Sequence, residues 1–217
     1  MNKKKISEIA FLEFFDEYEL ILKEGNVNKN IYVVNEGIVK IQKTINSKDI
    51  TIKLVGKGSI LGESALFEKD NISFYSAVAI DNSKILKFDK KNFKEILIND
   101  HVISFESLRQ FGYNYKDLFS SFSDLLLKGE IAFMVNNFLQ YRKLKETSEQ
   151  NINSILVSKE FLSQLTSSKK VELDKNIDTL IEINVIIKTD DGYLISETNV
   201  LDKCLAILEM KRKRTTK

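Results

Sequence analysis

The chain has 217 residues, of which 43% are hydrophobic, and its formal net charge is +2. This length is enough for two folded domains, and the apolar content excludes an intrinsically disordered chain. No run of about 18 apolar residues occurs, so we expect no membrane span. The single cysteine, Cys204, excludes an internal disulfide and a four-thiolate cluster, which suits a cytoplasmic protein. A net charge this small does not by itself identify a nucleic-acid-binding protein.

The first fifteen residues, MNKKKISEIAFLEFF, are basic and then apolar. No small-residue cleavage site is present, and charges at Glu8, Glu13 and Asp16 interrupt the apolar stretch. The pattern therefore predicts an amphipathic helix rather than a signal peptide.

Short β-branched segments separated by turn residues occupy the chain from Tyr18 to Asp89. The segments are IYVV at 31–34, IVKIQK at 38–43, TIKLV at 51–55, SAVAI at 76–80 and KILKF at 84–88. Strands of this length with regular turns predict a small antiparallel barrel or roll.

After Asp89 the pattern becomes helical, and up to Leu127 only Asn99-Asp100 breaks it. One row of residues alternates spacings of three and four: Phe105, Leu108, Gly112, Tyr115, Phe119, Phe122 and Leu126. This spacing is typical of the a/d seam of a coiled coil and predicts a homodimer interface along residues 100–128. The same spacing also fits a core helix of a monomer. A second apolar row beside the seam comprises Phe111, Leu118 and Leu125, and it can face the chain's own roll.

A second helix is predicted from Glu130 to Lys145, after the Lys128-Gly129 interruption, and a polar loop follows over residues 146–154. Ser158 can then cap a short helix, and Thr166-Ser167-Ser168 can form a turn before the next helix. Residues 185–196, VIIKTDDGYLIS, predict a hairpin with an Asp-Asp-Gly turn. Two helices, a tight turn and a hairpin together indicate a winged helix-turn-helix.

Four segments carry a resemblance to a known family. They are YVVNEGIVKI at 32–41, KGSILGESALFE at 57–68, GEIA at 129–132 and the stretch at 157–186 that begins VSKEFLSQLTSSKK. In this order they resemble the Crp/Fnr family of bacterial transcription regulators. The resemblance implies an α+β fold with a cyclic-nucleotide-binding-like roll (1–99), a dimerisation helix (100–128) and a winged helix-turn-helix domain (129–217). It also implies a homodimer that binds a palindromic DNA operator, RNA polymerase as a protein partner, and neither enzymatic activity nor a cofactor.

The resemblance places the DNA contacts on the second helix of the helix-turn-helix and on the wing. The implied residues are Ser158, Ser168, Lys169, Lys170, Val171, Glu172, Lys175 and Lys188. The family's usual Arg-Glu-x-x-x-Arg trio is replaced here by Lys170, Val171 and Lys175. Lysine lacks the rigid fork of arginine, and valine can touch a thymine methyl, so we expect a different half-site. The same lysines could equally belong to a solvated helix face.

The resemblance also implies an effector pocket, formed by Gly62, Glu63, Ser64, Tyr75, Ser76, Ala77 and Tyr115. In the family the cassette ends in Arg-Ser-Ala, and the arginine holds the cyclic phosphate. Here Tyr75 precedes Ser76-Ala77, and the roll contains no arginine. We therefore expect that cyclic AMP is not the switch, and that the pocket is filled by aromatic side chains or takes a different, apolar ligand. Glu63 could instead brace its own turn.

Two functions of other classes compete with this interpretation. One is a cyclic-nucleotide-binding-like regulatory subunit that acts through protein partners. The basic residues at the start of the second helix argue against this alternative. The other is an enzyme or redox sensor. His101 is the sole histidine and Cys204 the sole cysteine, and no catalytic motif accompanies them.

Overall fold

The computed structural model describes residues 9–45, 47–67, 70–128, 130–148, 152, 154–166 and 170–215. Within its helices, the side chains of residues 117–128, 170–171 and 209–215 lie outside this description. The chain divides into two compact units, Met1–Leu118 and Phe119–Lys217, each of which is described by itself. The fold class is α+β, as the sequence predicted.

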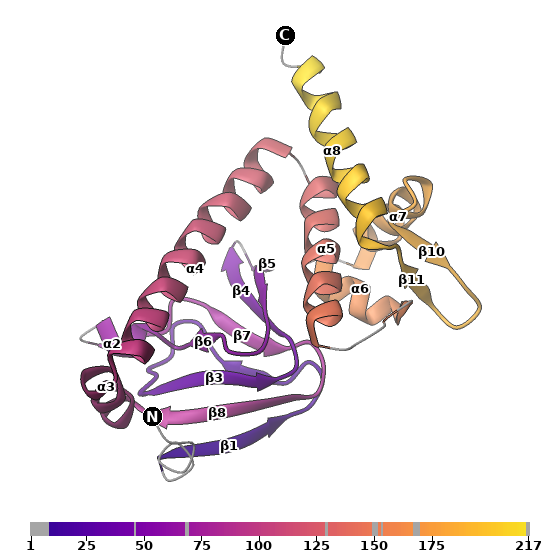
Figure 1. Ribbon diagram of the computed structural model, residues 1–217. Helices are drawn as coiled ribbons and strands as arrows, with labels where there is room; N and C mark the ends of the chain where they lie inside the picture. Colours follow the sequence, from indigo (N-terminus) through magenta and orange to yellow (C-terminus); the bar gives the residue numbers. More distant parts are fainter. Residues whose placement is uncertain are drawn as a thin grey trace. The chain divides into compact units, whose positions relative to one another are not determined.

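Two four-stranded antiparallel sheets form the first unit (Figure 1). One has the order β1-β8-β3-β6, and the other has the order β2-β7-β4-β5. The strands are β1 (Ala10–Phe15), β2 (Leu20–Leu22), β3 (Asn30–Glu36), β4 (Val39–Ile45), β5 (Lys48–Val55), β6 (Ile60–Leu61), β7 (Ser76–Ala79) and β8 (Ser83–Asp89). The short helix α2 (Ser64–Phe67) follows β6. All five strands expected from the sequence are present.

Two apolar clusters form the core of this unit. One lies between the sheets and includes Val39, Leu61 and Ile85. The other joins the outer face of β3 and β8 to helix α3 (Lys90–Asn99) through Ile31, Phe88 and Phe93. Alternate residues of β3 and β8 therefore serve different clusters, as the two-residue period of a strand requires.

The N-terminal segment is a strand and not the predicted amphipathic helix. Ala10–Phe15 pairs antiparallel with β8 over six residues, from Ala10 opposite Phe88 to Phe15 opposite Ser83. Residues 1–8 lie outside the described part of the chain. A free edge of β8 offers ladder hydrogen bonds that a surface helix cannot use, and this pairing overrides the weak helical periodicity. Phe11 and Phe14 remain exposed on the new edge strand.

Helix α4 (His101–Lys128) starts after the Asn99-Asp100 break that the sequence showed. Asp100 ends α3, and its carboxylate accepts a hydrogen bond from the Ile103 amide at 3.1 Å, which caps α4. That bond holds the pKa of the Asp100 carboxyl below its ordinary value.

The second unit consists of helices around a three-stranded antiparallel sheet of order β10-β11-β9. Its elements are α5 (Glu130–Ser148), β9 (Ile155–Val157), α6 (Lys159–Thr166), α7 (Lys170–Glu182), β10 (Ile186–Lys188), β11 (Tyr193–Ile195) and α8 (Thr198–Thr215). Helix α5 runs three residues beyond the predicted Lys145.

Two buried polar side chains of α5 hold this unit together. Arg142 is 3% exposed and donates from Nη1 to the carbonyl of Ile195 at 2.9 Å and from Nε to Glu146 at 2.8 Å. Asn137 donates to the carbonyl of Leu165 at 3.1 Å. These bonds tie α5 to the end of α6 and to β11, because an unpaired buried donor would be costly.

A buried lysine distinguishes the β2-β7-β4-β5 sheet. Lys40 lies in β4 between Leu54 and Val78, and it is only 3% exposed. Burial lowers the pKa of its ammonium from the ordinary 10.5 to about 8, although the charge of Asp49 opposes the shift. The unfolded chain therefore binds this proton more tightly than the folded chain does. Stability is reduced below pH 8 and recovers as the pH rises toward 10.5.

We expect Lys40→Met to stabilise the protein at pH 7 by about 1–3 kcal/mol, because methionine fills the site without charge desolvation. The gain should shrink between pH 8 and 10 as Lys40 of the wild type loses its proton. Urea denaturation at pH 7 and pH 10 measures both effects. Lys94→Met, at an exposed position of α3, is the control and should show no such pH dependence. A destabilised Lys40→Met protein at pH 7 would contradict the prediction.

Candidate functional site

The first candidate site is built around the turn between β6 and α2. Gly62 has a φ of +78°, and a Cβ at this position would lie 2.8 Å from the Asn30 carbonyl oxygen. Both features require glycine. Asn28 donates to the same carbonyl at 2.7 Å, within the segment that leads into β3. The turn therefore lies directly against the start of β3, and it presents the Gly62 amide and the Glu63 carboxylate together.

Tyr75 binds both of these groups through its hydroxyl. The hydroxyl accepts a hydrogen bond from the Gly62 amide at 3.0 Å and donates to Glu63 Oε2 at 2.5 Å. Burial, reinforced by the neighbouring Glu63, raises the pKa of the Tyr75 phenol well above its ordinary value, so the phenol stays protonated. Burial also raises the pKa of the Glu63 carboxyl, while the Tyr75 hydrogen bond and the charge of Lys53 oppose this shift. The tyrosine thus supplies internal partners to the groups that the sequence assigned to an effector.

A cavity of about 410 Å³ lies next to this bond. Its wall is mainly aromatic and aliphatic: Ile41, Ile52, Phe67, Phe74, Tyr75, Phe111 and Tyr115. Phe67 and Phe111 meet edge to face with ring centroids 5.7 Å apart. The polar wall residues are Glu63, Lys53 and Asn114, and Lys53 Nζ donates to Asn114 Oδ1 at 2.9 Å. We call this cavity the cassette pocket.

Three of the seven predicted pocket residues, Glu63, Tyr75 and Tyr115, line the cassette pocket. Gly62 contributes its amide to Tyr75 but does not line it. Ser76 accepts a hydrogen bond from the Glu24 amide at 2.9 Å, and Ala77 is fully buried in the core. Ser64 starts α2 with a buried hydroxyl that has no hydrogen-bond partner among the described residues.

The sequence did not identify Lys53, Phe67, Phe111 and Asn114 as pocket residues. Lys53 follows Ile52 in an ordinary alternating strand, and nothing local distinguishes it from a solvated lysine. Phe111 belongs to the row beside the predicted seam, and this was the one available signal that it faces the roll. Asn114 carried no signal other than its position next to Tyr115.

The second candidate site is the outer face of α4. Phe105, Leu108 and Tyr115 are 67%, 66% and 65% exposed, and a Cβ added at Gly112 would meet nothing within 4 Å. The remaining predicted seam residues, Phe119, Phe122 and Leu126, lie in α4, but their side chains are outside the described part. The described half of the seam is therefore a largely exposed apolar row, in which Phe105 and Leu108 line neither cavity and Tyr115 also borders the cassette pocket. Such exposure marks an interaction surface.

The third candidate site comprises α6, α7 and the hairpin β10–β11. Ser158 accepts a hydrogen bond from the Phe161 amide at 3.1 Å and caps α6 as predicted. Lys170 and Val171 are the first two residues of α7, while Ser168 and Lys169 lie outside the described residues. Glu172 and Lys175 are exposed on α7, and Lys188 is exposed on β10. Glu172 and Lys175 are thus accessible, while the side chains of Lys170 and Val171 lie outside the described part.

Acidic residues lie beside these lysines, and they were not among the residues predicted from the sequence. Asp174 and Asp178 are exposed on α7, and Asp174 forms an ion pair with Lys159 of α6.

The turn of the hairpin closes with a hydrogen bond from the Thr189 amide to the Gly192 carbonyl at 2.8 Å. Gly192 passes so close to β9 that a Cβ would lie 2.6 Å from the Val157 carbonyl oxygen.

Comparisons with known proteins agree with this geometry. Residues 12–100 match the family model of the cyclic nucleotide-binding domain. The anaerobic regulatory protein of Bacillus subtilis (strain 168) is 21% identical over 193 residues, which cover 88% of this chain and 81% of that protein. The chain is thus similar to Crp/Fnr transcription regulators, which confirms the resemblance inferred from the sequence. The similarity agrees with the prediction that the chain is a regulator and not an enzyme.

Solved structures of Crp/Fnr regulators share the fold. One from Eubacterium rectale has a TM-score of 0.70 at 12% identity and covers 95% of each chain. Another, from Thermus thermophilus, has a TM-score of 0.69 at 17% identity and covers 93% of this chain and all of the other. At these identities the likeness concerns the fold, and the residues of each site have to be judged from this chain's own geometry.

Three further findings concern membrane spans, metal ligands and the cysteine among the described residues. None of the described helices combines the length and the apolar run needed to cross a membrane. No three His, Cys, Asp or Glu side chains in the described ranges gather closely enough to hold a metal ion. Cys204 donates to the Ile183 carbonyl, and burial raises the pKa of its thiol, which disfavours the reactive thiolate.

We expect Tyr75→Phe to destabilise the first unit by about 1–3 kcal/mol, because it leaves a buried amide and carboxylate without their shared partner. The loss should be larger at pH 7.5 than at pH 4.5, since a protonated Glu63 is cheaper to leave unpaired. Chemical denaturation at both pH values measures this. Tyr113→Phe, on an exposed part of α4, is the control. Equal effects of both substitutions would contradict the bridging role of Tyr75.

Proposed function

We propose that this protein is a cytoplasmic, homodimeric transcription regulator that binds a palindromic DNA site and is not switched by cyclic AMP. The observation that carries the last part is the Tyr75 hydroxyl bound to the Gly62 amide and to Glu63. The first part is supported by the similarity to Crp/Fnr regulators and by the exposed Glu172 and Lys175 of α7. RNA polymerase is the protein partner we infer from the family.

The dimer proposal rests on the row Phe105, Leu108, Gly112 and Tyr115. Three large side chains about two-thirds exposed on one helix row are costly in a monomer, because each leaves apolar surface in water. Gly112 within the row lets two helix backbones approach closely. A second copy of the same helix satisfies both features, since a twofold axis brings identical rows together.

We expect the wild-type protein to sediment as a dimer at micromolar concentration and Leu108→Asp to sediment as a monomer, because an unpaired charge in the seam is costly. Tyr113→Asp is the matched control: it lies on the same helix at 57% exposure but outside the seam row, and it should remain a dimer. Two variants that behave alike, as dimers or as monomers, would show that the seam is assigned wrongly.

The DNA proposal assigns base contacts to Lys170, Val171 and Lys175 on α7, and backbone contacts to Lys188 on the wing. Ser158, Ser168, Lys169 and Glu172 complete the proposed surface. Two copies then place their α7 helices in successive major grooves, about one helical turn apart. Asp174 and Asp178 oppose non-specific attraction to phosphates, so we infer that base contacts carry an unusually large share of the affinity.

In binding assays on a site selected from random DNA, Lys175→Ala should lose about 1–3 kcal/mol and relax the base preference at one position. Lys188→Ala should weaken all sequences alike and reduce the salt dependence. Lys203→Ala, exposed on α8, is the control and should change neither. Absence of any duplex binding would instead favour a regulatory subunit that acts through protein partners.

The effector proposal follows from charge. A cyclic phosphate is an anion, and enclosing it requires donors that replace water. Tyr75 already occupies the Gly62 amide, and Glu63 places a carboxylate at the same spot. The cation in the wall is Lys53, whose ammonium bonds Asn114. The aromatic wall instead fits a ligand with a largely apolar body.

Calorimetric titration of the wild type with cyclic AMP and cyclic GMP should show no binding at micromolar concentrations and no effect on DNA affinity. Tyr75→Arg, which places a guanidinium at the cassette, should gain measurable affinity for at least one of them. Tyr113→Arg, which adds the same charge elsewhere on this unit, should not. Micromolar nucleotide binding by the wild type, with a tenfold gain in DNA affinity, would overturn the proposal.

A further inference from the structure

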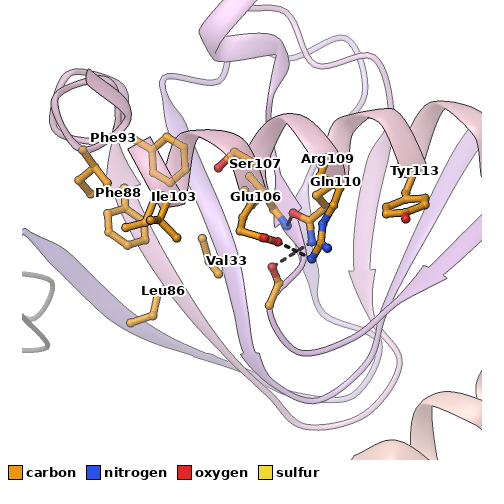
Figure 2. Close-up of a pocket in the computed structure, with 14 residues that line it drawn as sticks. Val33, Leu86, Phe88, Phe93, Ile103, Glu106, Ser107, Arg109, Gln110 and Tyr113 are labelled. Atoms are coloured by element: carbon orange, nitrogen blue, oxygen red, sulfur yellow. Dashed lines mark hydrogen bonds and ion pairs between the residues drawn. The ribbon is translucent and has the colours of Figure 1, made fainter. Parts of the chain in front are cut away.

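A second cavity, of about 430 Å³, is lined by residues of α4, α3 and the roll (Figure 2). We call it the flank pocket. Its base is made of buried residues from the roll and α3: Ile60, Phe88, Phe93 and Ile96. Val33, Leu86 and Ile103 complete the apolar wall. Its volume lies within the range of about 300–1,000 Å³ that is typical of pockets for small molecules.

The flank pocket has an apolar end and a polar end. Figure 2 shows Phe88, Phe93, Leu86 and Ile103 together at one end, and Glu106, Arg109 and Gln110 along α4 toward the other. Both polar atoms of the Gln110 side chain form hydrogen bonds to the roll. The side-chain oxygen accepts from the backbone N–H of Ile60 at 2.9 Å, and the side-chain nitrogen donates to the Gly58 carbonyl at 3.0 Å. The hydroxyls of Ser107 and Tyr113 also line the pocket, and the charged groups left to meet a ligand are those of Arg109 and Glu106.

Arg109 is the better candidate of these two. Its Nη2 donates to Glu106 Oε2, and both side chains are more than half exposed. An exposed pair three residues apart on a helix is weak, so a ligand can replace Glu106 at small cost. A guanidinium has five N–H donors in a planar fork, which matches a carboxylate, and one bond to Glu106 leaves donors for a second anion.

We propose that the flank pocket binds an aliphatic carboxylate, with the chain on the Phe88–Phe93 wall and the carboxylate on Arg109. This site is distinct from the cassette pocket. At about 100° per residue, Val102, Glu106, Arg109 and Tyr113 form one row of α4, whereas Phe111, Asn114 and Tyr115 at the cassette pocket lie on the opposite flank. The proposal does not depend on cyclic nucleotides or on DNA binding.

Occupation of the flank pocket would also reach the dimer surface. The row of Val102 and Arg109 lies about 80° around α4 from the row of Phe105 and Leu108. Val102 is 73% exposed at the rim, so an aliphatic chain in the pocket would cover surface directly beside the proposed seam.

The test is calorimetric titration of the full chain with laurate, dodecanol and dodecyltrimethylammonium, each kept below its micellar concentration. We expect one laurate per chain, weaker binding of the uncharged alcohol and no binding of the cation. Arg109→Gln should weaken laurate at least tenfold and leave dodecanol unchanged. Because Arg109 is exposed, this variant should fold normally, which thermal denaturation checks.

Lys53→Gln is the matched control, because Lys53 is the cation of the cassette pocket. It should leave laurate affinity unchanged. Loss of laurate binding in Lys53→Gln and not in Arg109→Gln would place the ligand in the cassette pocket and overturn the proposal. Tight binding of the ammonium, equal losses of laurate and dodecanol in Arg109→Gln, or no laurate binding at all would overturn it as well.

Discussion

The attachment of α4 to the roll is the contact on which both cavities of the first unit depend. Gln110 holds the turn between β5 and β6 through two hydrogen bonds, and Asn114 accepts one from Lys53 of β5. Phe111, next to Gln110, and Ile103, two turns earlier on the helix, pack on the cluster of Phe88 and Phe93. The helix therefore rests on the roll along one line, and the space on either side of that line forms the two pockets.

Polar attachment of this kind has a consequence for signalling. Apolar packing alone would let a helix slide or roll on a sheet, whereas hydrogen bonds at Gln110 and Asn114 define one register. A ligand that enters the cassette pocket contacts Asn114 and so approaches one of these bonds directly. The helix carries the proposed dimer seam on its outer face, so any change of its register would be passed to the partner subunit.

Tyr75 supplies the hydrogen-bond partners of the glycine turn from within the chain. The glycine turn requires Gly62 whether or not a ligand is bound, because a side chain there would collide with the Asn30 carbonyl. The amide and carboxylate at the turn need partners once buried, and a phenol can satisfy both without a charge. The cassette is thereby complete in the absence of a nucleotide, which fits a regulator that is constitutively competent or takes an apolar effector.

Neighbouring residues alone were enough to predict the strands between Tyr18 and Asp89, the break at Asn99-Asp100, the capping of α6 by Ser158 and the resemblance to Crp/Fnr regulators. These features depend on local periodicity, turn residues and motif order. The same motif order predicts that Tyr75 stands at the position of the family's arginine. The strand at 10–15 could not be predicted in this way, since the free edge of β8 lies more than sixty residues away along the chain. Tertiary structure likewise brought Lys53 to Asn114, the Tyr75 hydroxyl to Glu63, and Arg109 to the mouth of an apolar cavity. Periodicity tells which face of an element is buried, but the residue that covers that face comes from a distant segment, and no local pattern names it.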